Sequence, residues 1–181
     1  MARFLSRANS ALLVLALGCT LGACSFSSTR LTDEIRATVR ETEVWNDFMP
    51  GSQPSFHATM RVALRNTTER EIILLGAEGL VTSDSGPPVL RDGRHRQLRT
   101  GVPPGTPLRR FPAAMLFQDL DTREIRLAPG MEIELTLRSP MGVPPLDQKA
   151  HPYVRMTVEF RTSLDRSLAV QSGPVTPFVT Q

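Results

Sequence analysis

The chain has 181 residues, a formal net charge of +3 and 40% hydrophobic residues, a composition typical of a globular protein that can bury a core. All of its 21 basic residues except Lys149 are arginines, and 18 acidic residues nearly balance them, so the composition excludes a globally basic nucleic-acid-binding protein. Both cysteines, Cys19 and Cys24, lie near the N-terminus, so the rest of the chain has no thiol for a disulfide.

The first 23 residues have the organisation of an export signal. Arg3 and Arg7 give a positively charged start, and residues 11–17 (ALLVLAL) form an unbroken apolar run. A charged start, an apolar stretch of roughly 7–15 residues and small residues at the exit are typical of a secretory signal peptide. The run is shorter than the about 20 apolar residues that a membrane-spanning helix needs. We therefore expect residues 1–23 to be removed.

A cysteine follows the exit site directly. Leu21-Gly22-Ala23-Cys24 resembles the lipobox of bacterial lipoproteins, and the resemblance implies diacylglycerol on the Cys24 thiol, cleavage before Cys24 and acylation of the new amino group. Several fatty chains hold a protein on a membrane far more firmly than one. The next residue is Ser25 rather than Asp, which in such lipoproteins implies the periplasmic side of the outer membrane more than the inner membrane. An ordinary cleaved signal with an incidental Cys24 is the alternative.

The processed chain is expected to hold one domain. Loss of Arg3 and Arg7 with the signal leaves 19 basic and 18 acidic residues, a formal net charge of +1. A domain of about 150 residues buries roughly 68–70% of the surface of its unfolded chain, so its core can suffice without disulfides. We expect residues 24–34 to form a flexible tether and residues 35–181 to form the domain.

Alternation of apolar and polar residues predicts strands along this domain. The pattern is clearest at residues 56–64, where every second residue from Phe56 is apolar, as on a strand with one buried face. Residues 31–39 also fit a helix, but we favour a strand because Ile35, Ala37 and Val39 alternate with polar residues. Further strands are predicted at residues 35–45, 72–81, 109–117, 131–137, 153–162 and 168–171.

Proline and glycine separate these predicted strands. They are densest in two long loops, at residues 91–107 and 140–152. About seven strands with turn signals between them, and no long helical pattern, predict an all-β fold, an antiparallel β-sandwich of two sheets.

Two turn motifs add a resemblance to this prediction. Asn66-Thr67-Thr68 follows one alternating strand, and Leu127-Ala128-Pro129-Gly130 precedes another. This arrangement resembles the immunoglobulin-like domains of small bacterial envelope lipoproteins, the telokin-like accessory class, in which the first motif closes a hairpin and the second opens a strand on the opposite sheet. The resemblance covers residues 35–171. It implies a fold and a compartment, and it carries over no catalytic residue.

The sequence offers few candidates for a metal site. The domain has three histidines, His57, His95 and His151. His57 and Met60 are three residues apart on a predicted strand and so lie on opposite faces, which prevents them from sharing a metal. Met60, Met131 and Met156 each fall in an inward apolar register, so we expect them to pack in the core. No metal and no other cofactor is predicted.

Catalytic patterns are equally sparse. No Gly-x-Ser-x-Gly frame is present for a serine nucleophile. Asp119, Asp121 and Glu124 form an acidic cluster, but Arg123 and Arg126 lie among them, so we expect a solvated turn with exposed ion pairs. The sequence therefore predicts that the protein is not an enzyme.

An arginine cluster is the strongest candidate for a binding site. Residues 91–110 carry six arginines against the single acid Asp92, a local net charge of +5. Such a segment could contact an anionic partner, or it could be a loop that charge keeps in solvent. The six are Arg91, Arg94, Arg96, Arg99, Arg109 and Arg110.

Two aromatic residues near the end of the first predicted strand allow two interpretations. Trp45 and Phe48 could form a binding tip, or they could plug one end of the sandwich.

These observations lead to two functional hypotheses. The first is a lipid-anchored, periplasm-facing envelope lipoprotein whose domain binds an envelope protein partner without catalysis. The second is a ligand carrier or metallochaperone with a pocket between the sheets. In both, the chain contacts the membrane through lipidated Cys24 and binds no nucleic acid.

Replacing Cys24 tests the predicted anchor. Because the thiol is the expected site of lipidation, Cys24→Ser should move the protein from the membrane fraction to the soluble periplasm, measured by fractionation and immunoblotting. A variant that stays in the membrane fraction contradicts the lipid-anchor prediction.

Overall fold

The computed structural model describes residues 33–51, 53–86, 89–91, 94–96 and 102–180, with only the backbone described at 89–91 and 94–96. The predicted signal peptide, Cys24, the tether up to residue 32 and Arg99 lie outside the described residues. In the part of the chain that is described, no helix is long and apolar enough to cross a membrane.

Strands make up nearly all of the regular structure, which confirms the all-β prediction. Seven of them have five or more residues and match the predicted strands, including the strand favoured over a helix at residue 35. They are β1 (Ile35–Asp47), β2 (Ser55–Asn66), β3 (Ile72–Ser83), β4 (Val89–Arg91), β5 (Arg94–Arg96), β6 (Pro107–Phe117), β7 (Leu120–Thr122), β8 (Ile125–Leu127), β9 (Glu132–Arg138), β10 (Val154–Thr162), β11 (Ser167–Gln171) and β12 (Phe178–Thr180).

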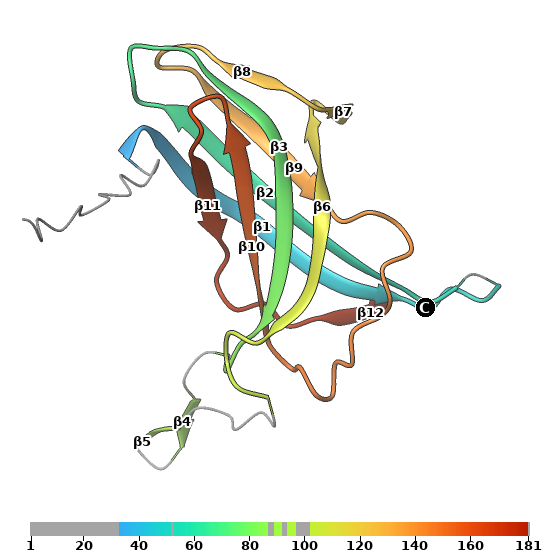
Figure 1. Ribbon diagram of the computed structural model, residues 1–181. Helices are drawn as coiled ribbons and strands as arrows, with labels where there is room; N and C mark the ends of the chain where they lie inside the picture. The colour runs from blue at the N-terminus through green and yellow to red at the C-terminus, as the bar shows by residue number, and fades with distance from the viewer. Residues whose placement is uncertain (1–32, 52, 87–88, 92–93, 97–101, 181) are drawn as a thin grey trace, which may run out of the picture.

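Ten of these strands form one curled sheet, with the order β11-β10-β3-β6-β9-β2-β1-β12 and with β7 and β8 paired to β6 and β3 (Figure 1). Strand β6 joins its two halves. The first part of β6, up to Ala113, pairs with β3, whereas its last part, from Ala114 to Leu116, pairs with β9. Because this connection makes a single hydrogen-bonded path, the immunoglobulin-like two-sheet arrangement stays a prediction.

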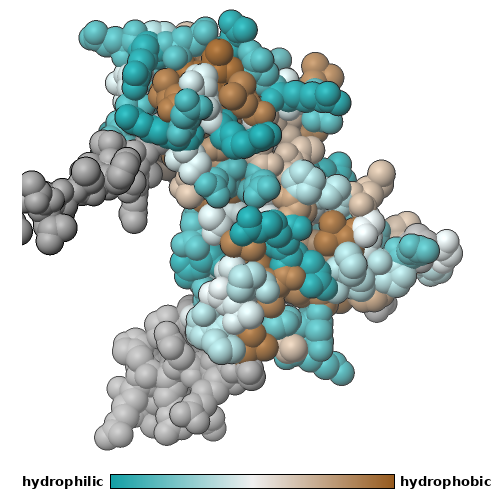
Figure 2. All heavy atoms as spheres, viewed as in Figure 1, coloured by the Kyte–Doolittle hydropathy of each residue, from teal (hydrophilic) through white to brown (hydrophobic). Residues whose placement is uncertain are grey.

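Both halves of the sheet contribute to one hydrophobic core. Strand β2 supplies Met60 and Leu64, and β10 supplies Val158 and Phe160, all four of which are fully buried. Alternate residues on each strand point inward, as the period of two predicts. On the face shown in Figure 2, apolar residues lie in separate groups among polar ones.

A buried asparagine holds one end of the sheet together. The Nδ2 atom of Asn66 donates hydrogen bonds to the carbonyl oxygens of Arg70, at 2.7 Å, and Leu127, at 2.9 Å. Its Oδ1 atom accepts from the backbone nitrogen and the hydroxyl of Thr68. The backbone nitrogen of Asn66 donates to the carbonyl oxygen of Met131 at 3.0 Å. Asn66 thus links the turn after β2 to the turn that leads from β8 to β9.

This link joins the two turn motifs found in the sequence. The Ala128–Met131 turn is closed by a 3.0 Å hydrogen bond from the nitrogen of Met131 to the oxygen of Ala128, and Gly130 has a φ of 71° there. Only glycine adopts this conformation without steric cost. The turn carries the chain from β8, which pairs with β3, to β9, which pairs with β2.

A second buried asparagine holds the opposite end. Asn46 donates from Nδ2 to the carbonyl oxygen of Leu146 at 2.7 Å, and its Oδ1 accepts from the nitrogen of Leu146 at 2.9 Å. The side chain therefore pairs with the loop at residues 140–152 as a strand would. Leu146 itself is buried in the core, so this proline-rich loop is part of the packed structure.

Replacing Asn66 tests its role in holding the sheet. Asn66→Ala should lower the free energy of unfolding by about 1–3 kcal/mol, because the buried carbonyl group of Leu127 loses its donor, whereas the exposed residue Arg70 keeps the hydroxyl of Thr68 as a donor. Urea denaturation measures this loss. Thr67→Ala is the control, since the hydroxyl of Thr67 makes only exposed hydrogen bonds. Equal losses in the two variants contradict the role assigned to Asn66.

Candidate functional site

The outward face of β1, β2 and β9 carries the candidate site. Strand pairing sets Glu41 on β1, Arg61 on β2 and Thr136 on β9 side by side in one row, and Leu116 on β6 extends the row. The neighbouring row contains Glu43 and is offset by two residues along each strand. The face is therefore built from outward positions of four strands that lie far apart in the sequence.

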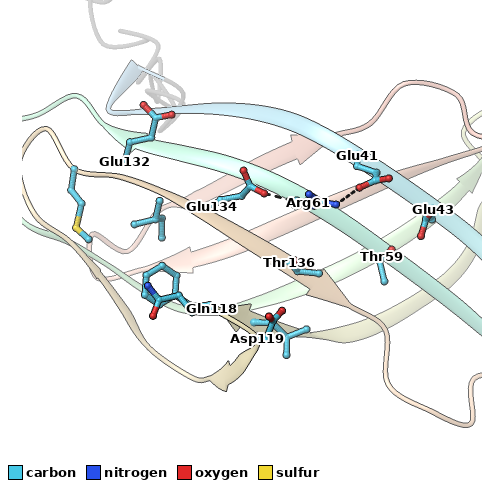
Figure 3. A pocket seen from close by; sticks show the side chains of 13 residues that line it. Glu41, Glu43, Thr59, Arg61, Gln118, Asp119, Glu132, Glu134 and Thr136 are labelled. Atoms are coloured by element: carbon cyan, nitrogen blue, oxygen red, sulfur yellow. Dashed lines mark hydrogen bonds and ion pairs between the residues drawn. The ribbon is translucent and has the colours of Figure 1, made fainter.

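A groove of about 740 Å³ lies on this face (Figure 3). Its walls come from β1, β2, β6, β9 and the turn after β6. A volume of this size lies within the usual range of about 300–1,000 Å³ for ligand sites. The ionisable residues that line it are Glu41, Glu43, Arg61, Asp119, Glu132 and Glu134.

One arginine faces five acids in the groove. Arg61 forms an ion pair with Glu41 and lies with its Nε atom 3.7 Å from Oε1 of Glu134 (Figure 3). All three side chains are about half exposed, so solvent screens these pairs and each contributes little to stability. With five carboxylates and one guanidinium, the groove has a formal net charge of −4. Such a surface attracts a basic partner.

The turn after β6 gives the groove one of its walls. Gln118 and Asp119 have φ angles of 51° and 63°, and the flanking Phe117 and Leu120 pair with each other. Two central residues with positive φ are typical of the two-residue type I′ hairpin. The sequence predicted a solvated turn from Asp119 to Glu124, and the structure places the short strand β7 inside that segment.

The predicted acidic cluster in the same segment does not assemble as one site. Asp119 lines the groove, whereas Glu124 pairs with Arg126 at 3.1 Å on the exposed surface. Arg126 also lies 3.7 Å from Glu71. These exposed pairs match the solvated arrangement that was expected.

Met131 corrects the prediction that three methionines pack in the core. Met60 and Met156 are fully buried, but Met131 is 39% exposed and lines the groove. The reason is local: Met131 belongs to the turn before β9, so the inward positions of this strand begin at Ile133. Met131 gives the acidic groove an apolar patch.

A row of aromatic rings continues the same outward face. Trp45 stacks on His57, with ring centres 5.2 Å apart, and on Phe178, with ring centres 5.9 Å apart. Trp45 follows Glu43 by two residues on β1, so the row adjoins the acidic groove. Trp45 is partly buried between its neighbours, whereas Phe48 in the following turn is 42% exposed. The exposed ring of Phe48 suits a binding tip, whereas Trp45 lies on the outward face of the sheet and does not plug the end of the core.

The two histidines whose side chains are described, His57 and His151, have separate surroundings. Nε2 of His57 lies 2.8 Å from the hydroxyl of Ser55, and its ring stacks on Trp45. His151 is partly buried, with no partner for Nδ1, and the side chain of His95 lies outside the description. No three histidine, cysteine or acidic residues among those described are grouped closely enough to hold a metal ion.

Most of the predicted arginine cluster lies where side chains are not described. Arg91, Arg94 and Arg96 belong to the β4–β5 hairpin, of which only the backbone is described. The two described members, Arg109 and Arg110, have different partners. Arg110 lies 3.4 Å from Glu78 on the surface.

Arg109 has a structural role that its charge did not reveal. Its guanidinium donates to the carbonyl oxygens of Pro144, at 3.1 Å, Pro145, at 2.7 Å, and Leu108, at 2.7 Å. It therefore fastens the loop at residues 140–152 to β6. This use of a guanidinium leaves Arg109 committed to backbone oxygens rather than to an anionic partner.

The sequence did not predict the groove. Glu132 and Glu134 occupy outward positions of a predicted strand, but alone they resemble an ordinary solvated strand face. The alternation that starts at Ile35 would place Glu41 and Glu43 inward, and only the β-bulge between Val39 and Glu41 turns them outward. Only the pairing of β1, β2 and β9 brings the two pairs to one surface.

Comparison with known proteins assigns no family to the chain. No family model and no curated protein matches it. Solved structures with similar shapes include structural genomics target SoR45 (13% identity, 83% of this chain and 89% of that one, TM-score 0.41). Another is Spo0M, a sporulation control protein from Bacillus subtilis (8% identity, 81% of this chain and 49% of that one, TM-score 0.40). A third is a copper-bound PCuAC domain from PmoF2 (12% identity, 77% of this chain and 91% of that one, TM-score 0.32). Likenesses at these scores indicate neither family nor function.

Replacing Arg61 tests how much its ion pairs in the groove contribute to stability. Arg61→Ala should lower the free energy of unfolding by less than about 1 kcal/mol, since its ion pairs are half exposed. The loss should shrink as salt is added, because salt screens the repulsion among the remaining acids. Urea denaturation at low and high ionic strength measures both effects.

Arg65→Ala is the matched control for this experiment. Arg65 lies four residues further along β2 on the same face and takes part in none of the ion pairs found among the described residues. A larger or salt-independent loss in Arg61→Ala contradicts the view that these are weak, screened pairs.

Proposed function

We propose that the protein is a lipid-anchored outer-membrane lipoprotein whose domain is a non-enzymatic protein-interaction module of an envelope assembly. The lipobox at Leu21-Gly22-Ala23-Cys24 supports the anchor. The two turn motifs linked through Asn66 support an immunoglobulin-like, telokin-like domain. The observation that carries the proposal is the acidic groove on the outward face of β1, β2 and β9.

The character of the groove favours a protein partner over a small substrate. Its charged side chains are about half exposed, so it is a wide surface feature rather than a closed pocket. Acyl transfer needs a nucleophile with an adjacent base. Among the described residues that line the groove there is no histidine, serine or cysteine, and the only hydroxyl groups are those of Thr59 and Thr136. A basic protein surface satisfies five carboxylates without any such chemistry.

The position of the groove suits a partner in the periplasm. The chain enters the domain at Ile35, and β1 then runs 13 residues, roughly 40 Å, to Asp47. Glu41 and Glu43 lie in the middle of that strand, and the aromatic row lies near its far end. An anchor on the N-terminal side of β1, as proposed, would leave the groove accessible to proteins beside the membrane.

Site-specific crosslinking tests the proposal. A photoreactive amino acid at Thr136, in the groove, should capture one reproducible envelope protein in intact cells, identified by mass spectrometry. The same amino acid at Thr157 is the control, because Thr157 is an equally part-buried outward threonine on β10. Charge reversal by Glu134→Lys should reduce the adduct at Thr136. Equal labelling from both positions, or no adduct at Thr136, contradicts the proposal.

A further inference from the structure

Strand β9 has an unpaired edge inside the groove. β9 pairs with β2 along its whole length, but with β6 only at Thr136, Leu137 and Arg138. The side of residues 132–135 that faces away from β2 therefore has no partner strand among the described residues. Figure 3 shows Gln118 and Asp119 beyond this side of β9, opposite to Arg61 and Glu41. An open edge of this kind is a template for another strand.

Two backbone positions point into the opening. The oxygen of Met131 accepts from the nitrogen of Asn66, and the nitrogen of Ser139 donates to the oxygen of Ala58, so both of these β9 neighbours point toward β2. In an antiparallel ladder, alternate residues direct their N–H and C=O groups to opposite sides. The N–H and C=O groups of Glu132 and Glu134 therefore point away from β2, into the groove.

The turn after β6 creates this opening. In the register that sets Leu116 opposite Thr136, a longer β6 would have brought residues 118 and 120 opposite Glu134 and Glu132. Instead the left-handed residues Gln118 and Asp119 end the strand. The chain returns as β7 on the other side of β6, since β7 and β9 both pair with it. The groove therefore lies at the position beside β9 where one more strand would otherwise pair.

We propose that this groove binds an extended, basic segment of a partner protein, which adds to the edge of β9 as a strand in line with β6. The inference rests on the proposed function and names the partner's chemistry. Side chains of an added strand alternate between two faces. Those on the outer face meet the groove carboxylates, which favours lysine or arginine. Those on the inner face meet Phe117 and Ile133, which favours apolar residues.

The edge of β1 and a second copy of this chain fit less well. The edge of β1 before Trp45 is also without a partner among the described residues, but a β-bulge between Val39 and Glu41 interrupts it. Bulges are a common means of blocking edge pairing. A second copy of this chain is also disfavoured at β9, because it would bring the Glu132 and Glu134 side chains of both copies together.

Peptide binding to the full chain, purified in detergent micelles, tests the inference. The probe is a capped nine-residue peptide of alternating lysine and valine, with a glutamate–valine peptide as the charge control. Only the lysine peptide should bind, and its affinity should fall with salt. Amide hydrogen exchange should slow about tenfold or more at Glu132 and Glu134. Exchange at Ile133 and Leu135, which already pair with β2, should change little.

N-methylated peptides separate strand addition from simple charge attraction. Directly opposed residues share a face, so the lysines lie opposite Glu132 and Glu134 and turn their N–H groups toward β9. Methylation of the lysine nitrogens should weaken binding about tenfold or more, whereas methylation of the valine nitrogens should be tolerated. Equal binding of the two methylated peptides overturns strand addition but leaves the proposed function intact.

Variants of the chain provide the matching test. Glu134→Pro removes the N–H group that points into the groove but leaves the pairing with β2. It also removes one negative charge, and Glu134→Gln measures the loss of affinity that comes from this charge alone. Binding should therefore be abolished in Glu134→Pro and only weakened in Glu134→Gln. Similar affinities in the two variants overturn the inference. The inference is also overturned if the chain is a dimer whose Glu132 and Glu134 amides are protected from hydrogen exchange before peptide is added. Absence of peptide binding overturns it too, and the Thr136 crosslink then decides whether the proposed function also fails.

Discussion

The hydrogen bonds of Asn66 set the register on which the groove depends. They bind the turn after β2 to Leu127 and Met131, and so fix where β9 begins beside β2. Because side chains alternate along a strand, a shift of one residue would turn Glu132 and Glu134 into the core and Ile133 toward solvent. A buried amide with every polar atom paired favours a single arrangement of the strands around it. The buried side chains of Ile133, Leu135 and Leu137 require the same register, so Asn66 and the hydrophobic alternation of β9 together place the acids outward.

The structure separates the parts that hold the fold from the parts that face a partner. The core, the two buried asparagines and Arg109 hold strands and loops in place through buried or backbone-directed contacts. The groove consists instead of half-exposed charges whose mutual attractions are weak. Weakly paired charges can exchange partners at little cost, since few of their contacts must be broken first. That property suits a surface that binds another protein.

The β6–β7 hairpin turns this charged face into a groove. A longer β6 would have covered the edge of β9. Gln118 and Asp119 instead adopt left-handed conformations that residues other than glycine seldom take. The resulting opening lies next to the acids and beside the exposed side chain of Met131. Backbone hydrogen-bonding groups, charge and apolar surface thereby meet at one place.

The sequence by itself determined the seven longer strands and the predicted export signal. A period of two is a local property that each strand displays alone, and Leu21-Gly22-Ala23-Cys24 is a contiguous motif that needs no fold to be recognised. Tertiary structure alone decided what the charged residues do. Arg109 bonds to a loop 35 residues away, while Glu41 and Glu134 approach Arg61 from separate strands. Strand order and pairing arise from contacts between distant segments, and local periodicity carries no information about which strands become neighbours.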